Sequence, residues 1–269
     1  MSQISILLVP GSFSLPEFYD TVVNAVSAQG HEMRTLHLLS AGLETGKGRP
    51  GPHTPTMADD AAMIAGEIEK LAQAGKAVIL VAHSYGGVPA TESTLGLRLE
   101  ERLREGKTGG VARLAYMTAL VPEVGASAAE VLADVPPENR DELTVDESGW
   151  MFRTDSAVAA AARHSFSDIP PDEGEAWVRR FPRHSAVSFQ GPLTHAGYTE
   201  VPVSYLLCEG DVTIPSKNQR AGIETVEKAS GRRVDVTSTK AGHCPIVSDP
   251  EAVVHWVMDL VRKTEISLQ

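Results

Sequence analysis

The chain has 269 residues, of which 42% are apolar and 22% are charged, and its formal net charge is −11. This length fits one large α/β domain or one domain that carries an inserted segment. No apolar run approaches the ~20 residues needed to cross a bilayer. No cluster of Lys and Arg with interleaved aromatic residues occurs either, so we expect no membrane and no nucleic-acid partner.

The two cysteines, Cys208 and Cys244, are too few for a disulfide framework. The start of the chain lacks the basic region and long apolar segment of a signal peptide. We therefore expect a reducing, cytoplasmic setting.

Strand and helix patterns alternate along most of the chain, which predicts an α/β fold with a mainly parallel sheet and helices on both faces. The expected strands are residues 4–9, 33–39, 78–81, 111–120, 203–208 and 233–238. The expected helices are residues 16–29, 58–74, 88–105, 216–229 and 250–262, and the Gly- and Pro-rich residues 40–56 form a loop.

Residues 123–200 break this rhythm, because they contain helical patterns at 157–162 and 173–180 but no strong strand pattern. We predict a helical cap insertion over 123–200, with 1–122 and 201–269 forming the core. The segment holds half of the aromatic residues. We expect some to form its own small core and others to line an apolar pocket above Ser84. The pocket candidates are Trp150, Phe152, Trp177 and Tyr198.

The segment Ala82-His83-Ser84-Tyr85-Gly86 follows the apolar, β-branched run 78–81 and precedes a helical pattern. Small residues two positions before and after Ser84 allow a strand and a helix to approach closely, with a strained, exposed serine between them. The usual pattern has glycine where this chain has Ala82. An ordinary turn is the alternative, but the strand–turn–helix context favours a nucleophilic serine.

A serine hydroxyl needs a base within hydrogen-bond reach. In a parallel sheet, the groups that converge on one site follow the carboxyl ends of strands. Of the nine histidines, only His243 directly follows a late strand, in a Gly-flanked loop ahead of the last helix. A surface histidine in a turn is the alternative, but the position suits a proton-transferring base.

An acidic residue should orient this base, and Asp211 in the loop after strand 203–208 is our choice. Glu209 would still lie at the strand end, and Glu123 is the reserve candidate. The chain order Ser, Asp, His is the order of the α/β-hydrolase arrangement.

An oxyanion hole completes such a site. One N–H group should come from Tyr85, the residue after the serine. The other should come from the loop after the first strand, where Gly11 permits an unusual backbone path. Ser12 is our donor in that loop, with Phe13 as the alternative.

Taken together, Pro10-Gly11-Ser12, the segment around Ser84, residues 209–215 and residues 242–245 resemble the α/β-hydrolase fold over nearly the whole chain. In detail the sequence is similar to the branch of plant methylesterases and hydroxynitrile lyases, and to fungal and bacterial α/β-hydrolases of secondary metabolism. The resemblance implies Ser84, Asp211 and His243 as a catalytic triad, a helical cap and no cofactor.

Plant hydroxynitrile lyases of this branch place a lysine beside the catalytic histidine and a threonine in the first-strand loop. This chain has Cys244 and Gly11 at the corresponding positions, which speaks against cyanohydrin cleavage. No metal-ligand motif occurs, so no metal is expected.

We expect a serine hydrolase that acts on an ester or lactone of a small, mostly apolar molecule. One alternative uses the same three residues for C–C bond cleavage or for lyase or cyclase chemistry. A second alternative is a non-catalytic ligand-binding receptor on the same fold. The sequence leaves the oligomeric state open.

Overall fold

The computed structural model describes residues 4–51 and 53–269. Residues 1–3, which contributed to the expectation of no signal peptide, lie outside the described residues. The described residues form a six-stranded sheet in the order β2-β1-β3-β4-β8-β9, and every neighbouring pair is parallel. Its strands are β1 (Ile4–Val9), β2 (Glu32–Thr35), β3 (Ala77–His83), β4 (Gly110–Met117), β8 (Val203–Cys208) and β9 (Asp235–Thr239).

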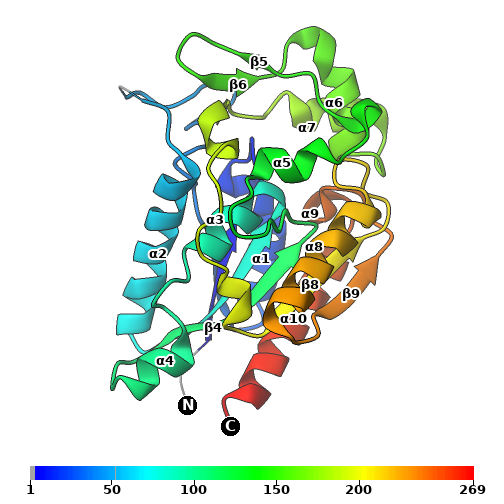
Figure 1. Cartoon of the computed structure of the whole chain (residues 1–269). Helices are drawn as coiled ribbons and strands as arrows, with labels where there is room; N and C mark the ends of the chain where they lie inside the picture. Colours follow the sequence, from blue (N-terminus) through cyan, green and yellow to red (C-terminus); the bar gives the residue numbers. More distant parts are fainter. Residues whose placement is uncertain (1–3, 52) are drawn as a thin grey trace.

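Helices cover both faces of the sheet (Figure 1). In β1, Ile6 and Leu8 belong to one core cluster and Leu7 and Val9 to the other, because successive side chains of a strand point to opposite faces. Helices α1 (Asp20–Ser27) and α10 (Pro250–Ser267) complete the first cluster. The second is completed by α2 (Met57–Gln73), α3 (Gly87–Glu92) and α8 (Ser216–Ser230). The predicted α/β architecture is confirmed.

The helix predicted over 88–105 is wrong in one respect, because it is interrupted between α3 and α4 (Leu99–Arg104). The Ser93 and Thr94 hydroxyls donate back to the carbonyls of Ala90 and Thr91. Gly96 has a φ of +68°, which is incompatible with a continuing right-handed helix. Local side-chain hydrogen bonds and one left-handed residue therefore end the helix early.

Most of segment 123–200 lies at the end of the molecule opposite to both termini, and its last residues run back along the molecule towards the start of β8 (Figure 1). They contain the expected helices and also a three-stranded sheet, β5-β6-β7, which the sequence did not predict. Its strands have only two or three residues each, too few to show a period of two. The helices are α5 (Ala128–Ala133), α6 (Val158–Ser165) and α7 (Pro171–Val178), and the strands are β5 (Thr144–Val145), β6 (Trp150–Phe152) and β7 (His184–Ser185).

Short 3-10 helices join several of these elements, and a one-turn helix, α9 (Pro245–Ser248), precedes α10. The 3-10 helices are η1 (Pro16–Tyr19), η2 (Ser84–Gly86), η3 (Pro137–Asn139), η4 (Asp155–Ala157), η5 (Ala186–Phe189) and η6 (Gly197–Thr199). Among the helices of residues 4–51 and 53–269, none combines the length and the apolar character that a membrane crossing requires.

The end of β1 and the start of α3 come into close contact at Gly86. A Cβ atom added to Gly86 would lie 2.5 Å from the Pro10 carbonyl oxygen and 2.8 Å from that of Val9. Both are backbone atoms, so a side chain fits there only if the strand or the helix moves. The sequence requirement for a small residue two positions after Ser84 therefore has a steric cause.

We expect Gly86→Ala to lower the free energy of unfolding by about 1–3 kcal/mol, because the methyl group overpacks this contact. The matched control is Gly66→Ala in the exposed part of α2, where an added Cβ meets nothing within 4 Å. That change should raise stability by about 0.5–1 kcal/mol through helix propensity. Denaturant unfolding measures both variants, and equal effects of the two would contradict the steric argument.

Candidate active site

Ser84 lies at the tight turn between β3 and α3. Its φ is 53°, in the left-handed region that a residue with a side chain rarely adopts. The Leu120 N–H donates to the Ser84 carbonyl over 3.0 Å and holds the turn. This strained backbone places the Ser84 hydroxyl at the carboxyl end of the sheet, as expected for a serine between a strand and a helix.

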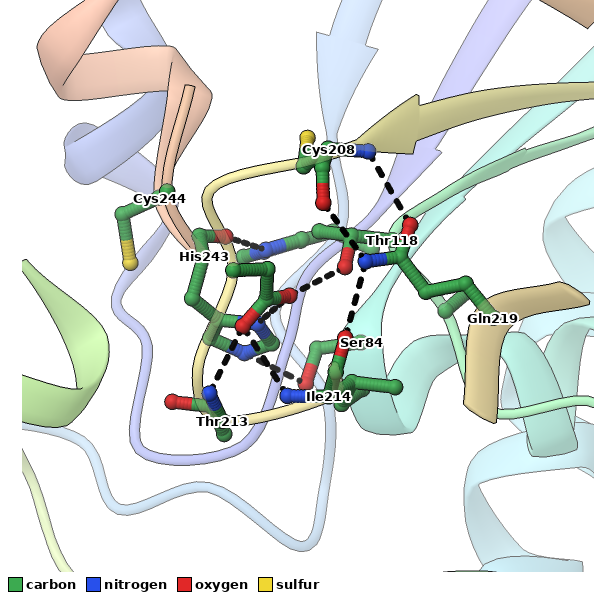
Figure 2. A network of polar contacts seen from close by, with 12 residues as sticks. Ser84, Thr118, Cys208, Thr213, Ile214, Gln219, His243 and Cys244 are labelled. Atoms are coloured by element: carbon green, nitrogen blue, oxygen red, sulfur yellow. Dashed lines mark hydrogen bonds and ion pairs between the residues drawn. The ribbon is translucent and has the colours of Figure 1, made fainter. Parts of the chain in front are cut away.

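The three side chains predicted to converge are in contact, and Figure 2 labels Ser84 and His243 among them. The Ser84 Oγ lies 3.0 Å from Nε2 of His243. Nδ1 of His243 lies 2.7 Å from Oδ2 of Asp211. Because the carboxylate oxygen accepts the Nδ1–H, Nε2 is left unprotonated and accepts the Ser84 hydroxyl proton. This arrangement can transfer a proton from the serine to the imidazole.

The Asp211 carboxylate is held by four donors, and its side chain is fully buried. Oδ1 accepts the N–H groups of Thr213 and Ile214 at 2.8 and 2.9 Å. Oδ2 accepts from His243 and from the Thr118 hydroxyl. These bonds hold the Asp211 carboxylate with Oδ2 facing Nδ1 of His243.

Gln219 braces the loop that carries this carboxylate (Figure 2). Its buried amide oxygen accepts the Cys208 N–H, and its amide nitrogen donates to the carbonyls of Cys208 and Ile214. One side chain of α8 thus ties both ends of the loop after β8 together.

The other two acidic candidates lie elsewhere. Glu209 pairs with Lys240 at the surface, and Glu123 is largely exposed, 3.9 Å from Lys228. Neither contacts His243, so the structure favours Asp211 as the partner of the imidazole.

Ser167 and Asp168 of segment 123–200 form hydrogen bonds with the loops that carry Asp211 and His243. The Ser167 hydroxyl donates to the Gly210 carbonyl over 3.2 Å. The Gly242 N–H donates to Oδ2 of Asp168 over 2.6 Å. The residues just before Asp211 and His243 are therefore anchored by neighbouring positions of one segment.

A buried hydrogen-bond chain runs beneath Ser84. Nε2 of His83 lies 2.8 Å from the His243 carbonyl, which can only accept, so Nε2 carries the proton. Nδ1 of His83 then accepts from the Tyr19 hydroxyl at 2.7 Å. The Tyr19 oxygen in turn accepts the Gly11 N–H at 2.9 Å. This chain connects the backbone of the loop that carries His243 with that of the first-strand loop at Gly11.

Burial sets the protonation states within this chain. Burial, together with the nearby His243, lowers the pKa of His83 to about 3. It raises the pKa of the Tyr19 phenol. His83 therefore stays neutral beside the imidazole of His243, whose ring centroid is 5.1 Å away. A neutral neighbour does not oppose the positive charge that His243 gains on accepting a proton.

The first-strand loop passes directly over Ser84, since a Cβ added to Gly11 would lie 3.1 Å from the Ser84 Cβ. The Gly11 N–H is engaged by Tyr19, and the Phe13 N–H donates to Nδ1 of His184 over 3.4 Å. Ser12 lies between these two engaged amides and lines the same cavity as Ser84. This arrangement favours Ser12 over Phe13 as the donor from this loop.

Tyr85, the residue after Ser84, is anchored by its side chain. Its hydroxyl donates to Oδ2 of Asp60 over 3.0 Å, and Asp60 also accepts from the N–H and hydroxyl of Ser40. Burial raises the pKa of Asp60 to about 6, although these hydrogen bonds act in the opposite direction. The anchored ring limits the movement of the Tyr85 backbone.

A central cavity of about 240 Å³ lies against Ser84 and His243. Its walls come from the core and from segment 123–200, and they are mainly apolar. Its aromatic lining residues are Phe13, Phe18, Tyr19, Tyr85, Phe166, Trp177, Phe181 and Phe189. A small apolar molecule fits such a space beside the serine.

Of the four aromatic pocket candidates, Trp177 lines the central cavity and the other three do not. Trp150 packs against the loop at Gly48. Phe152 contacts a neighbouring side cavity and lies under the Arg183 guanidinium. Tyr198 is buried, and its hydroxyl donates to the Pro122 carbonyl. These three expectations are corrected, because each ring is used in packing elsewhere.

Sequence reasoning also missed residues that support the site. Thr118 directly follows β4, which ends at Met117, but the expected strand 111–120 placed it inside the strand, so the strand-end rule that identified Asp211 did not find it. Tyr19, Gln219 and Asp168 lie on helices or in segment 123–200, and no sequence signal marks them. Within residues 4–51 and 53–269, no three His, Cys, Asp or Glu side chains are grouped so that they could hold a metal ion.

A family model described as the alpha/beta hydrolase family matches residues 6–256. A probable hydrolase of a Phoma species is 34% identical over 251 residues, which cover 93% of this chain and 95% of that protein.

Two solved structures share the fold at lower identity. A pyrethroid hydrolase from Sphingobium faniae has a TM-score of 0.71 and 24% identity, and the match covers 96% of this chain and 97% of that one. Polyneuridine aldehyde esterase has a TM-score of 0.71 and 17% identity, with 97% and 100% covered. The arrangement described above is therefore similar over nearly its full length to those two folds.

The two buried neutral histidines should make stability depend on pH. Burial lowers the pKa of both His83 and His184 to about 3, whereas in the unfolded chain they titrate near their ordinary value. The unfolded state then binds more protons between about pH 6.5 and 3, so stability falls as the pH falls from 6.5. At pH 5 we expect a loss of about 2 kcal/mol per histidine.

Denaturant unfolding at pH 7.5 and pH 5 measures this loss. His184→Gln removes one of the two groups and should make the pH dependence shallower. Asp60 is present in both proteins, so its contribution to the pH dependence cancels in the comparison. Its raised pKa increases stability as the pH falls from about 6 to 4, opposite to the effect of the histidines. Identical pH dependence in the two proteins would show that His184 is not kept neutral.

We expect Tyr19→Phe to slow the reaction of Ser84 with a fluorophosphonate probe by about tenfold or more, because the loops on both sides of Ser84 lose a shared hydrogen bond. Tyr116→Phe is the matched control, since it also removes a buried hydroxyl, one bonded to Thr91 away from the site. Both variants should lose similar stability, about 1 kcal/mol. Equal labelling rates for the two variants would show that Tyr19 has no positioning role.

Proposed function

Since the chain belongs to the α/β hydrolase family, we propose that it is a serine hydrolase that cleaves an ester or lactone of a small, mostly apolar molecule. The family match and the shared folds confirm the resemblance and the fold class predicted from the sequence motifs. The hydrolase names of its relatives agree with an enzymatic role.

One observation carries the proposal: the continuous contact from Ser84 through His243 to Asp211 at the floor of an apolar cavity. Each side chain comes from a different loop, and each loop is held by further hydrogen bonds. A buried serine in a strained backbone conformation, bonded to an imidazole with a fixed tautomer, is suited to nucleophilic attack.

In the proposed reaction, the Ser84 Oγ attacks the carbonyl carbon while its proton passes to Nε2 of His243. Asp211 stabilises the imidazolium that forms. The proton then moves to the leaving alkoxide, and the C–O bond breaks to leave an acyl-enzyme. Water, deprotonated by His243, attacks the acyl carbon, releases the acid and restores the Ser84 hydroxyl.

We propose that the N–H groups of Ser12 and Tyr85 bind the oxyanion of each tetrahedral intermediate. The engagement of the Phe13 N–H by His184 supports this choice, as does the anchoring of Tyr85 through Asp60. Such donors typically contribute ~3 kcal/mol each to transition-state stabilisation.

Residues 123–200 act in this proposal as a cap, because side chains such as Phe166, Trp177 and Phe181 close the cavity above Ser84. We further propose a reducing, cytoplasmic setting, which agrees with Cys208 and Cys244 both being free thiols.

The test is hydrolysis of p-nitrophenyl esters and of an aliphatic lactone in ¹⁸O-labelled water. We expect labelled oxygen in the acid product of the wild-type protein and a loss of roughly 10⁴-fold or more in kcat for Ser84→Ala. Ser93→Ala is the matched control, because Ser93 is a buried serine whose hydroxyl donates to the Ala90 carbonyl at the end of α3. It should retain activity and lose no more than about 1 kcal/mol of stability.

Three results would contradict the proposal in different ways. Retained activity in Ser84→Ala would exclude this mechanism. Turnover that depends on Ser84 without incorporation of ¹⁸O would indicate lyase or cyclase chemistry. Failure of the wild-type protein to react with any ester, lactone or fluorophosphonate would indicate a ligand-binding receptor.

A further inference from the structure

A second cavity adjoins the central one. This side cavity has a volume of about 300 Å³, compared with about 240 Å³ for the central cavity. Three residues line both spaces: Phe13, Arg153 and Phe181. The boundary between the two cavities is therefore made of side chains, with contributions from both the core and segment 123–200.

These three side chains form a stack. The rings of Phe13 and Phe181 have centroids 6.4 Å apart and lie within 19° of parallel. The Arg153 guanidinium carbon lies 4.2 Å from the Phe13 centroid and 5.2 Å from the Phe181 centroid. A guanidinium at these distances is attracted to the ring faces and fills the space beside them.

Asp141 fixes the guanidinium in this position. Its Oδ2 accepts from Nε and Nη2 of Arg153, and its Oδ1 contacts Nδ1 of His164 at 2.7 Å. Burial alone would raise the pKa of Asp141, but Arg153 and His164 hold it below its ordinary value. The Arg153 side chain is only 9% exposed. The boundary therefore includes a buried guanidinium that is held in place, and neutralised, by the Asp141 carboxylate.

We propose that Arg153 determines substrate length, because its side chain closes the central cavity against the side cavity. The inference rests on the proposed function and extends it. In the wild-type protein, the apolar group of the ester must end at the stack of Phe13, Arg153 and Phe181. Without the guanidinium, a longer chain passes beside the two rings, through the space that the guanidinium filled, into the side cavity.

The experiment compares Arg153→Ala with Arg153→Met. Both changes remove the charge and the ion pair with Asp141, but only alanine removes the volume that closes the boundary. The probes are p-nitrophenyl esters with straight acyl chains of increasing length, together with acetates of straight-chain alcohols. These two series vary the acyl side and the alcohol side of the substrate separately.

For Arg153→Ala, we expect the best chain length to increase and kcat/KM for the longest esters to rise by about tenfold or more in one of the two series. Arg153→Met should keep the wild-type length preference. Arg183→Ala is the control, since Arg183 lines the side cavity and not the central one, and it too should keep the wild-type length preference.

Phe181→Ala provides a second test if Arg153→Ala does not fold. It removes a different member of the stack, leaves the ion pair intact, and should also favour longer chains. An unchanged length preference in whichever of these variants folds, or the same shift in Arg153→Met, would overturn the inference. Ester hydrolysis by the wild-type protein separates this failure from failure of the proposed function.

Discussion

The hydrogen bond between Ser84 and His243 joins residues that are 159 positions apart in the chain. It exists because a parallel sheet brings the loops after β3, β8 and β9 to one edge. Each loop has to be held to a fraction of an ångström, because an imidazole that shifts slightly loses either the serine or the carboxylate. Many of the buried hydrogen bonds around the site hold these loops in position.

The supports are buried side chains whose hydrogen-bonding groups are satisfied. Gln219 braces the acid loop, and His83 with Tyr19 links the base loop to the first-strand loop. In a low-dielectric interior, such bonds are strong when complete and costly when one partner is missing. In the proposed reaction, the neutral state of His83 also has an electrostatic role, because His243 is then the ring of the pair that gains a charge.

Sequence reasoning located Ser84, Asp211 and His243 because strand ends are recognisable from apolar runs, and convergence follows from the topology. It placed Trp177 in the cavity wall but failed for the other three aromatic candidates, because an aromatic residue that packs in a core and one that lines a pocket have the same local pattern. Trp150 and Tyr198 were assigned to the pocket for this reason, although both pack elsewhere in the structure. Arg153 was not predicted either, since its role depends on Phe13, which is 140 positions away.

The contacts of Ser167 and Asp168 with Gly210 and Gly242 restrict how a molecule can reach the serine. If residues 123–200 lifted away as a rigid lid, the same motion would release the backbone next to both the acid and the base. Opening of such a lid would therefore also loosen the contacts of His243 with Ser84 and Asp211. In the proposed mechanism, a substrate that entered through side-chain rearrangement alone would leave both hydrogen bonds intact and the imidazole in contact with Ser84 and Asp211.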